Sequence, residues 1–195
     1  MWTPVDTRFD DKKLPVAIAH VDRGEQAIML RHLLEELGAI VLLHGISTPG
    51  DFTKVISQGD DAPPFLIIAS HGDENGLVFG EYIPRIDVSM LVEGSMPSSY
   101  IAQQVRLPGT FVINVSCYGG QPSMAQAFLS GGARGYIGTD PNPPTSNHAL
   151  FIASFFLSVI RRKRSAQEAW KLAAGYDEHS RSYLYYDEHG MQRVE

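Results

Sequence analysis

The chain has 195 residues, of which 44% are hydrophobic and 19% charged, and its net charge is −6. This composition is typical of a single globular domain, which we expect to span 1–195 with a polar segment at 1–13, and the acidic balance disfavours nucleic acid as a partner. No apolar stretch is long enough for a secretory signal or a membrane span, so we expect a cytoplasmic protein with no membrane association. The single cysteine excludes an internal disulfide.

Strand-like and helix-like patterns alternate along the first part of the chain. A buried strand is predicted at 14–21, and a helix at 24–37, where apolar residues recur with the helical period before a glycine. A second strand is predicted at 39–43, a short helix at 51–57 and a third buried strand at 65–70.

The rest of the chain continues the alternation after a stretch that is rich in turn residues. The predicted elements are a hairpin arm at 77–79, short helices at 88–92 and 98–104, a strand at 111–115, a helix at 122–129, a strand at 134–137, a loop at 140–144, helices at 146–161 and 166–174, and a last strand at 182–186, expected at an edge. Such alternation predicts a three-layer α/β/α sandwich with a mainly parallel sheet.

Two of the predicted strands end in chemically active side chains, each close to glycine. His71 follows the third strand and precedes Gly72, whereas Cys117 follows the fourth strand and is separated from Gly119 and Gly120 by one residue. Because ligands bind at the carboxyl edge of parallel sheets, we expect the imidazole and the thiol to meet there. This pair is typical of nucleophilic catalysis, with the backbone N–H groups of Gly72 and Cys117 as candidates to hold an oxyanion.

Several segments resemble the caspase-like (clan CD) cysteine peptidases. Residues 65–72 resemble their strand followed by His-Gly, and residues 112–120 (VINVSCYGG) resemble their strand followed by cysteine. Residues 127–139 (AFLSGGARGYIGT) are similar to the segment after the cysteine in bacterial CHAT-type and clostripain-like members. Residues 166–170 and 182–187 resemble their penultimate helix and closing strand, so the resemblance covers most of the chain.

The resemblance implies a caspase-hemoglobinase fold and a thiol endopeptidase that acts on a protein or peptide. Cys117 would be the nucleophile that forms a thioester, and His71 would protonate the leaving amine and then assist water. The backbone amides of Gly72 and Cys117 would form the oxyanion hole. No cofactor and no metal are expected.

Two residues are candidates for contact with the substrate. Relatives with basic specificity carry an acid two positions before the cysteine, where this chain has Val115, so the resemblance does not extend to their specificity. Asp140 follows the fifth predicted strand; it either binds an Arg or Lys side chain of the substrate or begins the turn before Pro141.

Other polar residues near strand ends have structural interpretations. Asp73 and Glu74 are typical turn residues, although they could instead orient His71 or attract a basic substrate. His20 and His44 also end strand-like runs, but no third ligand with metal-site spacing accompanies them, so we interpret them as structural.

Three alternatives to a constitutive peptidase stay open. A nucleophile-elbow hydrolase would need a small residue in place of Val115 and a histidine after the nucleophile. A caspase-like scaffold would need no reactive pair. An enzyme regulated by an activating partner protein, a ligand or cleavage would use loops that become ordered, and we expect such regulation to come from a separate chain or from cleavage within this one. The strand at 182–186 could pair with its copy in a homodimer.

Overall fold

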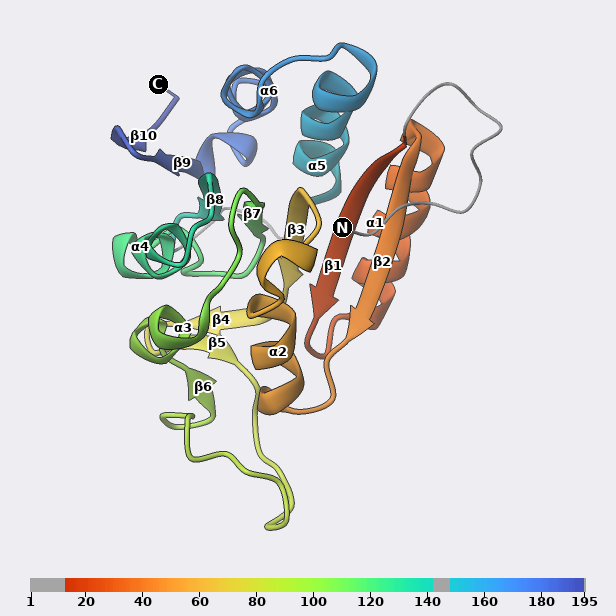
Figure 1. The fold of residues 1–195 in the computed structure, drawn as a ribbon. Coiled ribbons are helices and arrows are strands. Elements are labelled where there is room, and N and C mark those ends of the chain that lie inside the picture. The colour runs from red at the N-terminus through yellow and green to blue at the C-terminus, as the bar shows by residue number, and fades with distance from the viewer. Residues whose placement is uncertain (1–12, 142–147, 195) are drawn as a thin grey trace.

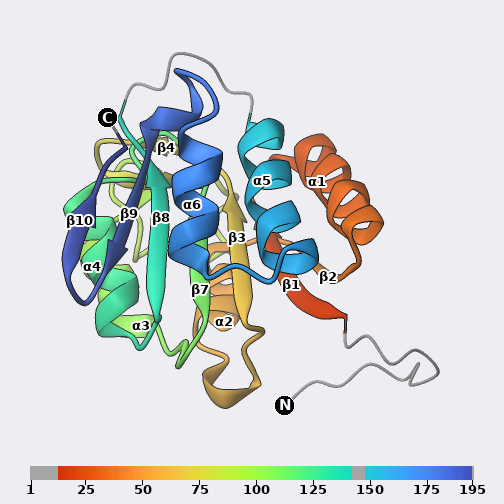
Figure 2. The same cartoon turned by 90° about the horizontal axis from the view of Figure 1, so that it is seen from above.

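A computed structural model describes residues 13–141 and 148–194. A seven-stranded sheet forms the middle layer, and helices cover both of its faces (Figures 1 and 2). The α/β/α sandwich predicted from the alternation of elements is therefore confirmed.

The central sheet is mainly parallel, as predicted. Its strands, in spatial order, are β2 (Ala39–Gly45), β1 (Leu14–His20), β3 (Phe65–Ala69), β7 (Phe111–Asn114), β8 (Gly135–Thr139), β9 (Tyr183–Asp187) and β10 (Gly190–Gln192). The first five run parallel, and β9 and β10 run antiparallel to their neighbours. Ile68 of β3 faces Asn114 of β7, so these two strands end at the same level.

Two hydrophobic cores hold the helices against the sheet. One core contains side chains of α1 (Gly24–Leu37), α5 (His148–Phe156) and α6 (Ala166–Ala174), and the other contains side chains of α2 (Pro49–Ile56), α3 (Ser98–Gln104) and α4 (Pro122–Ser130). Successive strand residues point to opposite faces, so Val16 and Ile18 of β1 enter the first core and Ala17 and Ala19 enter the second. Among the described helices, none is both long and apolar enough to cross a membrane.

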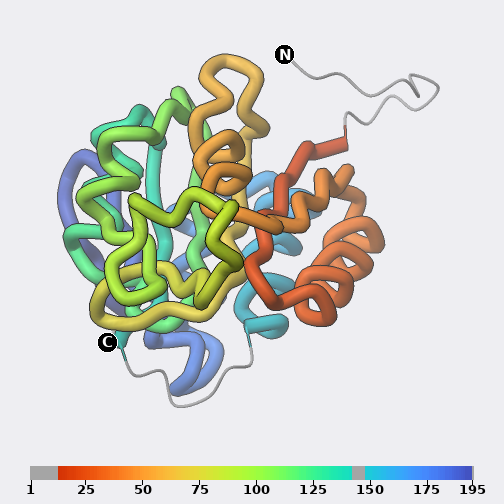
Figure 3. The backbone as a smooth tube through the Cα atoms, turned by 90° about the horizontal axis from the view of Figure 1, so that it is seen from below, coloured from red at the N-terminus to blue at the C-terminus, as the bar shows by residue number. Residues whose placement is uncertain are grey.

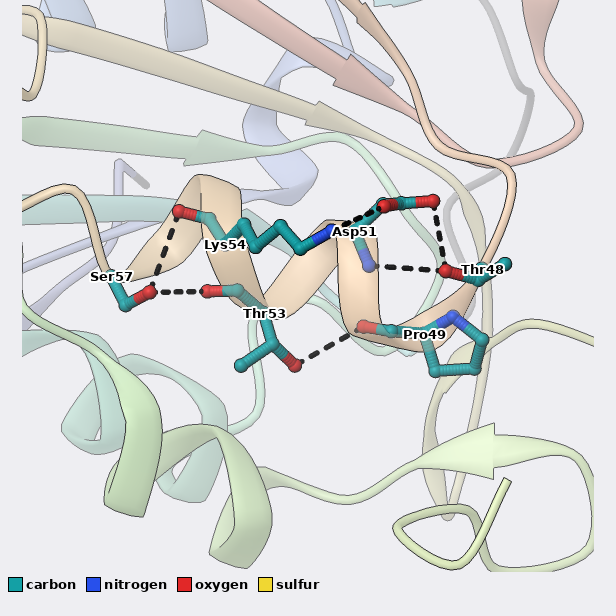
Figure 4. A network of polar contacts seen from close by, with 6 residues as sticks. All are labelled: Thr48, Pro49, Asp51, Thr53, Lys54 and Ser57. Carbon is teal, nitrogen blue, oxygen red and sulfur yellow. Dashed lines mark hydrogen bonds and ion pairs between the residues drawn. The ribbon is translucent and has the colours of Figure 1, made fainter. Parts of the chain in front are cut away.

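Helix α2 begins two residues earlier than the predicted start of 51–57, because Thr48 caps it (Figure 4). The Thr48 hydroxyl accepts a hydrogen bond from the Asp51 N–H at 3.2 Å and donates to the Asp51 carboxylate at 2.8 Å. Pro49 occupies the first turn, where its missing N–H costs no hydrogen bond. Lys54 binds the other carboxylate oxygen of Asp51 at 3.1 Å.

A small antiparallel sheet lies across the end of the main sheet toward which β1 and β2 point (Figures 1 and 3). It consists of β4 (His71–Asp73), β5 (Gly76–Val78) and β6 (Ser95–Met96). β4 follows β3 after a single residue, Ser70. The predicted hairpin arm at 77–79 thus corresponds to β5, and its partner strand carries His71.

The predicted helix at 88–92 is wrong, because this stretch forms turns between β5 and β6. The Asp87 carboxylate accepts a hydrogen bond from the Ser89 N–H at 2.9 Å, which offers the backbone an alternative to the helical pattern. Val92 then forms a bridge with Ser95 and leads the chain into β6.

The last predicted strand forms, but it does not lie at an edge. β9 lies between β8 and β10, and β10 is the edge strand. A turn at Glu188–His189 joins the two strands, and the His189 N–H donates to the Asp187 carboxylate at 2.8 Å. Pairing between copies of this chain through β9 would therefore require β10 to move.

The predicted helix at 146–161 is described from His148 onward, and its last turn is π-helical rather than α-helical. α5 ends at Phe156, and a π-helical turn (Leu157–Arg161) continues the chain, with the Arg162 N–H donating to the Leu157 carbonyl at 3.3 Å. The predicted start of this helix and most of the predicted loop at 140–144 lie outside the described residues. The remaining short elements are 3₁₀ turns at Gly59–Asp61 and Ser180–Ser182.

Candidate active site

The strand order of the main sheet defines where a site is expected. β2 lies on one side of β1, whereas β3, β7 and β8 lie on the other side. The order in which successive strands are added to the sheet therefore reverses between β1 and β3. Ligands of open α/β sheets bind outside the carboxyl ends of the strands at such a point. Arg23 comes shortly after β1 and His71 shortly after β3, so both lie at this place.

Gly72 brings the His71 segment against Cys117. A methyl group on Gly72 would overlap the carbonyl oxygen of Cys117 and would lie 3.1 Å from Cβ of Ser116. Glycine is therefore required for this close approach of two backbones. The structure thus places the backbone of the His71-Gly72 segment beside that of Cys117, although 46 residues separate the histidine from the cysteine (117 − 71 = 46).

The loop that carries Cys117 turns sharply. Cys117 is half-buried, and the next residue, Tyr118, adopts a left-handed backbone conformation with φ of 58°. The Gly120 N–H donates to the Thr139 carbonyl at 2.6 Å, which ties the loop to the end of β8. Within residues 13–141 and 148–194, the Cys117 N–H donates to no protein acceptor.

A buried polar network joins the Cys117 loop to the strands of the main sheet. The side-chain oxygen Oδ1 of Asn114 accepts a hydrogen bond from the Ser116 N–H at 3.0 Å, and Nδ2 of the same side chain donates to the Tyr136 hydroxyl at 3.0 Å. The Tyr136 hydroxyl donates in turn to the Gly119 carbonyl at 2.6 Å. Burial raises the pKa of Tyr136, so the hydroxyl keeps the proton that this last bond needs.

Two further strand residues complete this support. The Thr139 hydroxyl donates to the Ser116 carbonyl, and the Tyr186 hydroxyl donates to the Gly120 carbonyl at 2.5 Å. The network was not predicted from the sequence. The available signal was Asn114, a polar residue in an apolar run, because buried polar groups need partners.

Tyr136→Phe should destabilise the protein by about 1–3 kcal/mol, because it leaves a buried carbonyl and a buried amide without partners while the ring remains. Urea unfolding of the wild type and the variant measures this difference. Tyr176→Phe is the matched control, since Tyr176 is 66% exposed and should tolerate the change. Equal free energies of unfolding for Tyr136→Phe and the wild type would show that the network does not support the loop.

His71 has a polar partner that the sequence did not suggest. The ring is exposed, and its Nδ1 atom receives a hydrogen bond from Nη2 of Arg23 at 3.0 Å. Partial burial lowers the pKa of His71, the positive charge of Arg23 lowers it further, and Asp22 acts in the opposite direction. The imidazole is therefore neutral over more of the acidic range than a free histidine.

Asp73 closes the β4–β5 hairpin. Its carboxylate accepts hydrogen bonds from the N–H groups of Asn75 at 2.9 Å and Gly76 at 3.0 Å, and from the Ser95 hydroxyl at 2.7 Å. These contacts match its interpretation as a turn residue. Glu74 lies exposed at the tip of the hairpin.

The two candidate substrate contacts lie in different surroundings. The Asp140 N–H donates to the Ser182 carbonyl at 2.8 Å, and its carboxylate forms an ion pair with Arg193, so its charge already has a partner. Val115 is 2% exposed and packs in the core beneath α1, α5 and α6, so its side chain offers no surface to a substrate.

The opposite edge of the sheet contains a hollow of about 780 Å³. Pro15, Pro64 and Thr110 line it and lie at the amino ends of β1, β3 and β7, and Asp60 and His44, the latter near the carboxyl end of β2, line it as well. No described cysteine or serine lines this hollow. Among the described residues, no cluster of three or more His, Cys, Asp or Glu side chains is arranged to hold a metal ion.

Comparisons with known proteins find only distant structural similarity. No protein-family model and no curated protein matches the chain. The structure is similar to the Arg specific cysteine proteinase gingipain R, with a TM-score of 0.48, 13% identity and coverage of 86% of this chain but only 43% of the gingipain chain. A fusion of the yeast Spc42 trimeric coiled coil (amino acids 181–211) has a TM-score of 0.35, 18% identity and coverage of 83% of this chain and 91% of that one. Similarity at this level assigns no family.

Proposed function

We propose that the protein is a hydrolase that uses a cysteine nucleophile. The observation that carries this proposal is the contact between Gly72 and the Cys117 carbonyl, which joins the His-Gly segment after β3 to the cysteine after β7. The N–H of Cys117, which has no acceptor in the described part of the chain, supports it, because acyl transfer needs a donor for the oxyanion.

Within that class, we propose a caspase-like endopeptidase that resembles the CHAT-type and clostripain-like members. The motifs at 65–72, 112–120 and 127–139 support this finer assignment, because they resemble those members in order and spacing. The central parallel strands with the antiparallel β9 beside β8 are compatible with it. A protein or peptide would be the substrate, and no cofactor takes part.

The proposed reaction follows from the chemistry of the pair. The Cys117 thiol gives its proton to His71, and the sulfur attacks the peptide carbonyl carbon, while the N–H groups of Gly72 and Cys117 hold the oxyanion. His71 passes the proton to the leaving amine, which leaves a thioester on Cys117. Water, deprotonated by His71, then releases the acid and restores the thiol.

Substrate selection and regulation are also proposals. Asp140 is the candidate to bind a basic side chain, and this would require Arg193 to leave its carboxylate. An activating partner protein, a ligand or cleavage would act on the turns between β5 and β6, the two strands that form the small sheet together with β4, which carries His71. A homodimer would form through the edge strand β10 rather than β9.

A peptide library and a thiol-directed acyl probe test the function. We expect the native wild type to cut some peptides and to react with the acyl probe faster than the urea-unfolded protein does. Because Cys117 is the only cysteine, Cys117→Ala controls for every label, and iodoacetamide measures simple access to the thiol. A native protein that cuts no peptide and reacts with the acyl probe no faster than the unfolded chain would instead support a scaffold.

A further inference from the structure

Arg23 makes a hydrogen bond that determines where the proton of His71 lies. A guanidinium has only donors, so the bond from Nη2 of Arg23 to Nδ1 of His71 requires a lone pair on Nδ1. The ring that Arg23 binds is therefore neutral and carries its proton on Nε2. In this arrangement both ring nitrogens are occupied, one by a proton and the other by Arg23.

This arrangement cannot perform the first step of the proposed reaction. To accept the Cys117 proton, His71 needs a free lone pair, and its remaining lone pair on Nδ1 is engaged by Arg23. When Arg23 moves away, Nδ1 takes the thiol proton and the ring becomes an imidazolium. The imidazolium later gives that proton to the leaving amine, and the neutral ring can bind Arg23 again.

We propose that Arg23 is a positioning residue that holds His71 in a resting state, and that catalysis requires Arg23 to release Nδ1. The inference rests on the proposed function for the identity of the proton donor, Cys117. It adds a residue that lies outside the two strand-end motifs, in the connection between β1 and α1.

The surroundings of Arg23 support a contact that can break. Its side chain is half-buried, and its Nε–H is buried without a hydrogen-bond acceptor in the described part of the chain. The resting arrangement therefore satisfies the guanidinium only in part, which favours exchange with a second arrangement.

The charged and titratable groups around the ring agree with this assignment. Arg23 disfavours the imidazolium, and Asp22, which precedes it in the same connection, favours it. Cys117 lies beside Gly72 on the loop after β7. His148 of α5 also lies within the field of Arg23, and its low pKa keeps it uncharged near neutral pH. Arg23 is therefore the group whose removal should most favour protonation of His71.

Nitrogen-15 NMR of the histidine rings tests the inference on the intact protein, with His71→Gln to identify the signal. In the wild type we expect a neutral His71 with its proton on Nε2. In Arg23→Ala the His71 titration should shift to higher pH, and iodoacetamide should alkylate Cys117 several-fold faster near neutral pH. Arg23→Lys, which keeps a charged donor, should restore part of the wild-type behaviour.

Arg31→Ala is the matched control, because it removes the same charge from an exposed side chain of α1 and should change neither measurement. A wild-type ring with its proton on Nδ1 would overturn the inference, and this measurement needs no variant. An unchanged His71 titration in a folded Arg23→Ala protein would overturn it too. Failure to cut peptides would instead count against the proposed function, because neither the ring titration nor the alkylation depends on cleavage.

Discussion

Gly72→Ala is expected to lower peptide turnover by about 10²- to 10³-fold, because the added methyl group has no space beside the Cys117 carbonyl. The methyl carbon would be fixed to the backbone of β4, and the atom that it overlaps is a backbone oxygen, so a side-chain rotation cannot relieve the overlap. β4 must move away from the Cys117 loop. This movement would separate His71 from the thiol and misplace the N–H of Gly72.

The measurement is kcat/KM on the best peptide from the library, together with the rate of reaction with the acyl probe. Gly50→Ala is the matched control, since Cβ at that position would lie 3.8 Å from the Thr48 hydroxyl oxygen, an ordinary contact. Urea unfolding checks that the Gly72 variant keeps its fold. Wild-type turnover in Gly72→Ala would mean that the approach of β4 to Cys117 is not needed for activity.

Protonation of His148 should lower the free energy of unfolding by about 3 kcal/mol as the pH falls from 7 to 4. Burial lowers the pKa of His148 to about 4, with smaller effects from His179 and Arg23, and its Nδ1 atom lies 2.6 Å from the Tyr183 hydroxyl. In the unfolded chain the ring takes up a proton near pH 6.5, but in the folded protein it does so only near pH 4. The stabilisation is therefore complete above pH 6.5 and is lost progressively below it.

Urea unfolding at pH 7 and pH 4.5 measures this loss in the wild type and in His148→Gln, whose side chain can still bond to Tyr183. The variant should show a smaller difference between the two pH values, whatever its stability at pH 7. His20, His44 and His71 also have lowered pKa values, so some pH dependence will remain. An identical difference in the wild type and the variant would contradict a buried neutral His148.

Local patterns were sufficient to predict most of the main sheet and its helices. The period of apolar residues located α1 over its full length, and α6 forms over the predicted range 166–174. Short apolar runs predict buried strands, and reactive residues at the ends of such strands suggest a site at the carboxyl edge of the sheet. His71 and Cys117 were predicted in this way as a candidate pair.

The parts that could not be predicted depend on contacts between distant residues. Arg23 reaches His71 only because β1 and β3 are neighbours, and nothing in the sequence near Arg23 indicates this. The position of β9 inside the sheet depends on the short β10 strand, which has no apolar pattern of its own. The segment at 88–92 had an apolar composition suited to a helix, but the Asp87 turn and the bridge from Val92 to Ser95 determined its shape.

The bond from Tyr186 to Gly120 has a consequence for protein synthesis. The hydroxyl that supports the Cys117 loop comes from a residue 66 positions after Gly120 in the chain. A nascent chain that has just exposed its thiol therefore lacks this support, and Tyr136 can provide only part of it. The loop of Cys117, the proposed nucleophile, would become complete only once β9 has been translated and has paired with β8, so the proposed site would assemble late in translation.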